Sequence, residues 1–230
     1  MIVPGLAERY ARIQASLLPG VELVAVSKTR SIEEIRALYD LGHRAFGENY
    51  PQELKEKQAA LPADIEWHFI GHLQTNKVKL ISSFVRLVHA VDSDRLLDEL
   101  EKRAAQAGRT QDVLLQMHIA QEETKHGFAP AELRALLAQP DITTRWPSVR
   151  VRGLMGMASN TPDREQVARE FASLGGLFRE IRDHGPFPAA QFTELSMGMT
   201  SDTDLAMAAG STLVRIGTAL FGERPPQATR

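Results

Sequence analysis

The sequence predicts a single (β/α)8 barrel of the TIM type with one extra helix at its N-terminus. Strand-like and helix-like segments alternate eight times along 230 residues, and no stretch of linker composition divides them. The strands are short apolar runs, which are typical of a parallel sheet covered by helices. We therefore expect one domain over 1–230, with a helix at 1–18, the barrel at 21–222 and a frayed tail at 223–230.

The first half of the chain is expected to form the extra helix and four strand–helix units. Apolar residues recur at helical spacing from Leu6 to Leu17, which predicts the extra helix. Ser31 and Glu34 form a capping-box pattern at the start of the next helix, and a polar helix is expected from about Thr75. The four strands are predicted at 21–28, 43–49, 65–71 and 85–91.

The second half repeats this alternation. Asp92 or Ser93 is expected to cap the helix after the fourth strand. Thr161 as the cap and Pro162 at the first helical position predict the start of a long helix that ends at Gly185. The strands are predicted at 112–119, 149–157, 192–198 and 212–217. A doubly wound open sheet is the alternative fold, but it needs a glycine-rich turn after the first strand, and SKTRS is not one.

Composition narrows the class of protein. The net charge of −2 provides no basic footprint for nucleic acid. The absence of cysteine excludes a disulfide framework and a thiolate metal site, and it suits a reducing compartment. Charged residues interrupt the apolar residues near the N-terminus, unlike a signal peptide, and no run is long and apolar enough to span a membrane. We therefore expect a cytoplasmic protein that binds neither nucleic acid nor a membrane.

Unusual residues gather where the predicted strands end. Barrel proteins build their sites from the residues just after the strands, at the carboxyl end of the barrel. Loop composition alone would scatter such residues over both ends, so their gathering predicts a ligand site at this rim. The residues that end or follow the strands are Lys28, Glu48, Asn49, His72, Met155, Ser196, Met197, Gly198, Gly217 and Thr218.

Lys28 is the most informative of these residues, because it follows the apolar run of the first strand. Desolvation beside apolar atoms disfavours an ammonium and lowers its pKa from the usual value of about 10.4. An amine without its proton can attack a carbonyl and form a Schiff base. The alternative interpretation is a lysine that only returns the strand to solvent.

The last two strand ends predict a phosphate site. SMGMT at 196–200 and RIGT at 215–218 supply glycines that let the backbone approach a ligand, and hydroxyls from Ser196 and Thr218. Each motif alone also fits a tight turn that needs glycine. Arg215 shares a strand face with Leu213, and a guanidinium among apolar neighbours needs an acceptor. That acceptor is either a carboxylate of the barrel or a ligand atom with a lone pair.

No metal site is expected from histidine spacing. His68 and His72 lie four residues apart on a strand, which separates them by about 13 Å. His118 and His126 have no partner at a suitable spacing. A reactive lysine that faces a phosphate cradle leaves two ligand classes open: pyridoxal phosphate, or a sugar phosphate as in lysine-dependent aldolases. An inert barrel is the third interpretation.

Seven motifs resemble one known family along nearly the whole chain. They are AVSKT, FGENY, WHFIGHLQTNK, ETKHG, GLM, LSMGM and GSTLVRIGTALFG, in matching order and spacing. They resemble the pyridoxal phosphate homeostasis proteins, the YggS-like family, whose barrel is similar to the N-terminal domain of alanine racemase. The resemblance implies pyridoxal 5′-phosphate held as a Schiff base on Lys28, Asn49 near the cofactor ring and Arg215 facing the pyridine nitrogen. The other cofactor contacts expected are Met155, Ser196, Gly198, Gly217 and Thr218, the last four at the phosphate.

The resemblance also implies a function. Such proteins are thought to carry or buffer the cofactor and to influence vitamin B6 and amino-acid balance, without efficient catalysis. We therefore expect a monomer with PLP-dependent apo-enzymes as possible recipients. The aldolase is disfavoured, since those enzymes place their lysine on a later strand, whereas a racemase or decarboxylase of the alanine racemase-like fold remains the alternative. One departure is visible: the family usually has Ser-Asp-Asp where this chain has Thr200-Ser201-Asp202.

Overall fold

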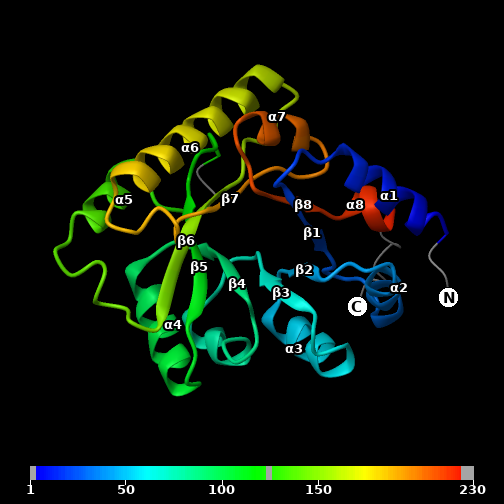
Figure 1. The fold of residues 1–230 in the computed structure, drawn as a ribbon, viewed down its shortest axis with the longest axis horizontal. Helices are drawn as coiled ribbons and strands as arrows, with labels where there is room; N and C mark the ends of the chain where they lie inside the picture. Colours follow the sequence, from blue (N-terminus) through cyan, green and yellow to red (C-terminus); the bar gives the residue numbers. More distant parts are fainter. Residues whose placement is uncertain (1–3, 123–125, 224–230) are drawn as a thin grey trace.

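The structure is a closed barrel of eight parallel strands surrounded by helices (Figure 1). It is a computed structural model that describes residues 4–122 and 126–223. Each strand pairs with the next one along the chain, and β8 pairs with β1 to close the sheet. The predicted fold is therefore confirmed. The strands are β1 Glu22–Val26, β2 Ala45–Glu48, β3 Glu66–Phe69, β4 Leu87–Val91, β5 Gln111–Met117, β6 Val149–Gly156, β7 Glu194–Ser196 and β8 Leu213–Ile216.

A helix follows every strand and packs against the outside of the barrel. After β3 this helix is a short 3-10 helix, η1, which begins at Thr75, where the polar helix was expected. The extra helix α1 lies beside α8, where the Arg9 Nε donates to the carbonyl oxygen of Leu220 at 2.7 Å (Figure 1). The helices are α1 Leu6–Ser16, α2 Ile32–Asp40, α3 Pro51–Ala60, η1 Thr75–Leu80, α4 Asp94–Gln106, α5 Pro130–Leu137, α6 Arg164–His184, α7 Thr203–Ala208 and α8 Thr218–Phe221.

Two helix starts were predicted correctly and one was not. The capping box of Ser31 and Glu34 is present at α2, and Ser93 occupies the cap position of α4, although its hydroxyl does not bond the helix backbone. The prediction of Thr161 and Pro162 at the start of α6 was wrong. Asp163 caps this helix, because its carboxylate accepts from two backbone amides, at 3.0 and 3.1 Å. A carboxylate that binds two free amides at a helix start outweighs the preference for proline at the first position. The tail expected to fray lies outside the described residues from 224 onwards.

The core has two parts, one outside the barrel and one within it. The outer part lies between the sheet and the helices and contains most of the large apolar side chains. The inner part fills the barrel with a small apolar cluster and, above and beside it, four buried polar residues. The apolar cluster comprises Val24, Leu87, Ala90, Leu114, Met155 and Leu213. The four polar residues are His68, His89, Ser196 and Arg215.

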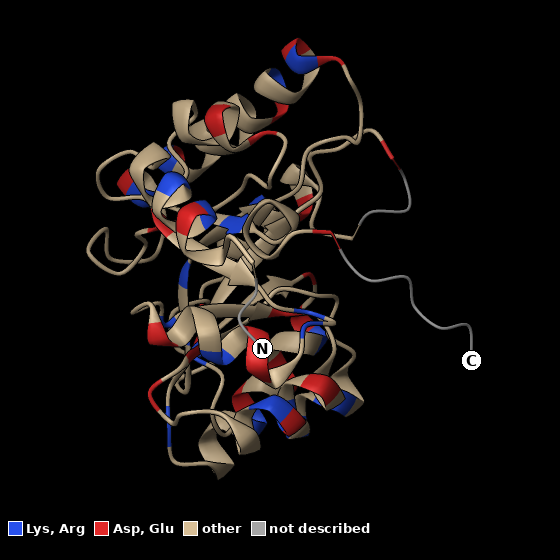
Figure 2. Ribbon diagram, turned by 90° about the vertical axis from the view of Figure 1, so that its right-hand side faces the viewer, with Lys and Arg blue, Asp and Glu red and all other residues tan. Residues whose placement is uncertain are grey.

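The surface carries charges of both signs. Figure 2 shows acidic and basic residues interspersed along the helices in this view, without a continuous run of one sign. Helix α4, for example, pairs Arg103 with Glu99 one turn earlier at 2.6 Å. Among the described residues, no helix combines the length and the apolar composition that crossing a membrane requires.

Candidate functional site at the carboxyl end of the barrel

Lys28 lies two residues beyond the end of β1, in a sharp turn at the mouth of the barrel. The residue after it, Thr29, has a φ of 62°, which is the left-handed region that L-residues rarely adopt. The backbone amide of Thr29 donates to the Glu53 carboxylate at 2.6 Å, which holds the turn in this conformation. Lys28 itself is half-buried, as expected for a residue that leaves the core. The turn therefore fixes the direction in which the Lys28 side chain leaves the strand.

A buried ion pair supports this turn from below. The Lys57 ammonium donates to the Glu48 carboxylate at 2.7 Å, to Glu53 at 2.6 Å and to the carbonyl oxygen of Ser27 at 2.7 Å. The Ser27 hydroxyl donates to the same Glu48 oxygen at 2.6 Å. Burial raises the pKa of Glu48, and the Lys57 charge opposes this effect. Because both partners are buried, the pair locks the residue that precedes Lys28 against α3.

Arg215 is the central charge inside the barrel. Its guanidinium donates to the Ser196 hydroxyl at 2.5 Å and to the carbonyl oxygen of Gly156 at 3.1 Å. Burial lowers its pKa to about 10, so it remains protonated at neutral pH. No ion pair with a carboxylate is found for it within residues 4–122 and 126–223, although Asp202 favours its charged form from a distance. The carboxylate alternative from the sequence is therefore excluded for the described residues, and the guanidinium retains donors for another acceptor.

A chain of hydrogen bonds runs from Arg215 down the barrel interior. Ser196 Oγ lies 2.9 Å from His89 Nδ1, and His89 Nε2 lies 2.8 Å from His68 Nδ1. Arginine can only donate, so the Ser196 oxygen accepts from it, and His89 Nδ1 is the one other group near this buried hydroxyl, among the described residues, that can accept its proton. His89 must then carry its proton on Nε2, and His68 must do the same. Burial lowers the pKa of His68 to about 4 and that of His89 well below its usual value, which keeps both rings neutral.

Ser196 lies inside the barrel. The sequence predicts its hydroxyl at a phosphate, and in the structure this hydroxyl lies between Arg215 and His89. Its physical role here is to hold the guanidinium. Met155, the other predicted contact from a strand interior, is 1% exposed and belongs to the inner apolar cluster beneath the mouth.

Asn49 contributes an acceptor without a partner. Its Oδ1 is buried and accepts no hydrogen bond from the described residues. Gly71 allows the close packing that positions Asn49, because a Cβ there would lie 2.5 Å from the Asn49 carbonyl oxygen. A buried amide oxygen without a donor is costly, so this atom marks a position where a ligand donor fits.

Two glycine turns follow β7 and β8, and β8 is the neighbour of β1 in the closed sheet. Gly198 has a φ of +92°, and a Cβ there would lie 2.5 Å from the Cβ of Ala206. Gly217 passes Val26 so closely that a Cβ would lie 3.3 Å from its backbone oxygen. The Arg215 amide donates to the Gly198 carbonyl at 3.0 Å, which joins the two turns. Exposed Thr218 begins α8, where the first backbone amides have no acceptor within the helix.

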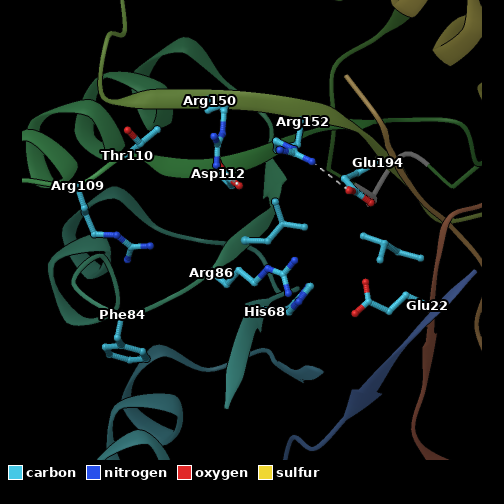
Figure 3. Close-up of a pocket in the computed structure, with 12 residues that line it drawn as sticks. Glu22, His68, Phe84, Arg86, Arg109, Thr110, Asp112, Arg150, Arg152 and Glu194 are labelled. Atoms are coloured by element: carbon cyan, nitrogen blue, oxygen red, sulfur yellow. Dashed lines mark hydrogen bonds and ion pairs between the residues drawn. The ribbon is translucent and has the colours of Figure 1, made fainter. Parts of the chain in front are cut away.

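A separate hollow of about 420 Å³ lies at the opposite, amino end of the barrel (Figure 3). Three of its four arginines are paired with carboxylates: Arg150 binds Asp112 at 2.6 Å, Arg152 contacts Glu194 at 3.4 Å, and Arg86 pairs with Glu66. The fourth, Arg109, donates to the backbone carbonyl oxygens of Ser82 and Val85. It is lined by strand starts, far from Lys28, and conventional barrel sites lie at the other end. We interpret it as a ring of stabilising ion pairs. His68 lines its wall, so the buried hydrogen-bond chain reaches this end of the barrel.

Sequence reasoning missed the residues that support the site. The sequence predicts Glu48 at the rim but indicates no partner for it, and it predicts no role for Lys57 or His89. The spacing of Glu53 and Lys57, four apart on one helix, was a usable signal for an ion pair. The partners of His89 come from β3 and β7, so only the strand register around the closed barrel identifies them.

Comparison with known proteins places this geometry in a family. The family described as alanine racemase, N-terminal domain, matches residues 4–225. The pyridoxal phosphate homeostasis protein of Aquifex aeolicus is 43% identical over 206 residues, which are 88% of this chain and 87% of that protein. That of Pasteurella multocida is 39% identical over 209 residues, with 89% of this chain and 87% of the relative covered.

Solved structures agree with this assignment. PipY of Synechococcus elongatus PCC7942 has 39% sequence identity and a TM-score of 0.88 without PLP, over 94% of this chain and 100% of PipY. With PLP bound, its TM-score is 0.85 over the same shares. Alanine racemase of Bartonella henselae shares only the fold, at 17% identity and a TM-score of 0.68 over 98% of this chain and 62% of the racemase. The chain belongs to the family of pyridoxal phosphate homeostasis proteins.

Proposed function

We propose that this protein binds pyridoxal 5′-phosphate at the carboxyl end of the barrel and carries or buffers it for cofactor and amino-acid homeostasis. The observation that carries the proposal is the place of Lys28 and Arg215 on two adjacent strands, Lys28 just beyond the end of β1 and Arg215 within β8. Arg215 lies level with Val24, so at most about 13 Å of strand separates it from Lys28. The names of the relatives and the PLP-bound structure of PipY support the choice of cofactor.

The residues present fit the cofactor. Lys28 supplies an amine for a covalent bond to its aldehyde carbon, and the buried Asn49 Oδ1 offers an acceptor beside it. Gly198, Gly217 and Thr218 provide backbone that a phosphate can approach, together with one hydroxyl. Arg215 can donate to the lone pair of a pyridine nitrogen. Met155 and Ser196 act from below, as the floor and as the support of Arg215.

Arg215 favours a carrier over an efficient enzyme. When bound, pyridoxal phosphate supplies an electron sink for reactions of amino acids, and the sink is strong only when the pyridine nitrogen is protonated. A guanidinium cannot give up its proton at neutral pH, and its positive charge disfavours a second charge beside it. Ser196 and Gly156 hold it in place, so it cannot turn away. Racemase or decarboxylase activity is therefore disfavoured.

Titration with the cofactor tests the binding site. The wild type should acquire a visible absorption band on addition of pyridoxal phosphate, and Lys28→Ala should not, while its far-ultraviolet circular dichroism stays unchanged. Lys55→Ala is the matched control, since Lys55 is exposed on the outer helix α3, and it should retain the band. An unchanged band in Lys28→Ala would reject Lys28 as the attachment point.

Proton exchange tests the carrier interpretation. The loaded protein is incubated with single L-amino acids in deuterated water, and the α-hydrogen signal is followed by NMR. The signal should persist over hours, and loss at the rate of ordinary enzymes would restore the racemase alternative.

Cofactor delivery completes the proposal. The carrier acts as a monomer in the cytoplasm and passes its cofactor to PLP-dependent apo-enzymes. Mixing the loaded protein with such an apo-enzyme should restore its activity faster than the free cofactor released by the carrier would allow. Light scattering at the mass of a dimer would reject the monomer.

A further inference from the structure

Three potential metal ligands meet on the half of the mouth that lies away from Lys28 and Arg215. His72 follows β3, Asp92 follows β4 directly and His126 lies in the loop after β5. His72 Nδ1 is 3.2 Å from Asp92 Oδ2, and the rings of His72 and His126 stack with centroids 4.1 Å apart. One ligand atom of each residue lies within 4.8 Å of the other two. The sequence-based exclusion of His126 from a metal site missed these partners, because they come from neighbouring strands.

The backbone holds His126 in this position. Its carbonyl oxygen accepts from the Gln116 side chain at 2.8 Å, and Gln116 lies within β5. The next residue, Gly127, has a φ of +136°, and a Cβ there would lie 2.5 Å from the His118 amide nitrogen. Phe128 then bonds back to β5, with its amide 2.7 Å from the Gln116 carbonyl oxygen. The chain on the C-terminal side of His126 is therefore anchored to the end of the strand.

His72 and Asp92 are fixed in the same way. Gly71, before His72, packs directly on the backbone of Asn49. The Asp92 side chain is only 14% exposed, and its Oδ1 accepts from the Ser93 hydroxyl at 3.3 Å, which directs Oδ2 toward His72. The ion pairs found in the described part of the chain give Asp92 no lysine or arginine partner. A carboxylate with little exposure and no lysine or arginine partner among the described residues favours a bound cation.

We propose that His72, Asp92 and His126 bind one zinc ion, with a fourth coordination position open to water. Two imidazole nitrogens and one carboxylate oxygen suit zinc, whereas magnesium and calcium prefer oxygen ligands. Zinc bonds of about 2.0–2.1 Å place tetrahedral ligand atoms about 3.3 Å apart, which matches the pair already at 3.2 Å. His126 is exposed, so rotation of its side chain brings a ring nitrogen from within 4.8 Å of the other two ligand atoms to the distance that zinc requires.

The zinc site has a mechanical consequence. It joins the ends of β3, β4 and β5, so it holds the His126 side chain against the rim. Three protein ligands and one open position are the arrangement of exchangeable or reactive zinc, whereas structural zinc sites have four protein ligands. Lys28, Arg215 and the two glycine turns lie on other strands. Of the proposed cofactor contacts, Asn49 adjoins the zinc site, because Gly71 packs on its backbone.

Zinc titration tests the site on tag-free protein treated with EDTA and then dialysed. Competition with a chromophoric chelator should give one zinc per chain, and Co²⁺ should produce the visible band of a tetrahedral N/O site. His126→Ala and Asp92→Asn should weaken zinc binding at least about a hundredfold, because a direct ligand contributes more than a supporting residue. Asp92→Asn preserves the shape of the side chain while it removes the charge.

His184→Ala is the matched control, because His184 is an exposed histidine at the end of α6, outside the proposed site. It should bind zinc like the wild type. All variants should retain the circular dichroism of the wild type and bind pyridoxal phosphate equally, since none of the substituted residues is a proposed cofactor contact. Equal zinc affinity of the wild type and His126→Ala, or no binding by the wild type at micromolar zinc, would overturn the proposal and leave an ion pair beside stacked rings.

Discussion

The arginines at the two ends of the barrel differ in their partners. At the amino end, arginines meet carboxylates on the surface, as in the pairs Arg150–Asp112 and Arg152–Glu194 (Figure 3). At the carboxyl end, Arg215 is buried without a carboxylate partner among the described residues, and Asn49 keeps an unsatisfied oxygen. Paired surface charges stabilise a fold modestly, whereas unsatisfied buried groups cost stability and are kept where a ligand completes them. Unsatisfied atoms alone do not decide the assignment, because His68 Nε2 and Gln111 Oε1 near the amino end also lack a partner among the described residues. The uncompensated charge of Arg215, together with the Asn49 oxygen, identifies the carboxyl end as the functional one.

The largest expected difference between the two ends concerns the ion pair beneath Lys28. Glu48→Ala leaves Lys57 buried with only part of its charge compensated, so we expect a loss of about 3–5 kcal/mol in the free energy of unfolding. Asp112→Ala breaks a pair in which Arg150 is 46% exposed, so we expect a loss of at most about 1 kcal/mol. Urea unfolding measures both, and equal losses would contradict the contrast.

The buried histidines inside the barrel should make the free energy of unfolding depend on pH in the acid range. The pKa of His68 is about 4 in the folded protein, against about 6.5 in an unfolded chain. The unfolded chain therefore binds protons as the pH falls from about 6.5 to 4, whereas the folded protein does not, so stability falls over this range. His68 contributes up to about 3 kcal/mol to this loss, and His89 and His43, with pKa values lowered by burial, act with the same sign.

Substitution of His68 separates its contribution to this loss of stability from the contributions of His89 and His43. His68→Gln offers an acceptor to His89 but does not titrate in this range, so it should flatten the dependence of stability on pH between 6.5 and 4. His184→Gln, on the exposed end of α6, should leave the dependence unchanged. Identical curves for His68→Gln and the wild type would show that His68 does not stay neutral in the folded protein.

An arginine at each end provides the next comparison. Arg215→Met should weaken the binding of pyridoxal phosphate about tenfold to a hundredfold, since a hydrogen bond that involves a charged group contributes about 1.5–3 kcal/mol. Arg152→Met removes an arginine from the amino end and should leave the affinity unchanged. Fluorescence or absorbance titration measures both constants. A similar effect of the two substitutions would mean that Arg215 acts only through the fold.

The smallest expected effect is at the phosphate. Thr218→Ala removes an exposed hydroxyl that competes with water, so it should weaken pyridoxal phosphate a few-fold to about tenfold. Pyridoxal without its phosphate should bind the variant and the wild type equally. If both compounds lost the same factor, the hydroxyl would not contact the phosphate.

The sequence predicted what depends on local patterns. The eight apolar strands, the capping box of Ser31 and Glu34, and the face that Arg215 shares with Leu213 all follow from spacing within one element. Lys28 followed from its place after a strand. The alternation of strand and helix then selected the barrel, because right-handed parallel units around one core close in this way.

Pairings between distant strands could not be predicted in this way. His89 and Ser196 are 107 residues apart and meet across the barrel interior. His72, Asp92 and His126 meet only because three neighbouring strands end at the same level. Both groups depend on the strand register of the closed sheet, which one sequence does not specify. Asp163 was missed for a local reason, since a threonine–proline pattern next to it gave a stronger signal for the start of the helix.

The position of the covalent bond is the most direct test of the account. The protein is loaded with pyridoxal phosphate, reduced with borohydride and digested, and the modified peptide is identified by mass spectrometry. The account predicts one pyridoxyl group per chain, on the peptide that contains Lys28. A label on Lys77 or Lys125 in its place would contradict the assignment of the carboxyl-end site.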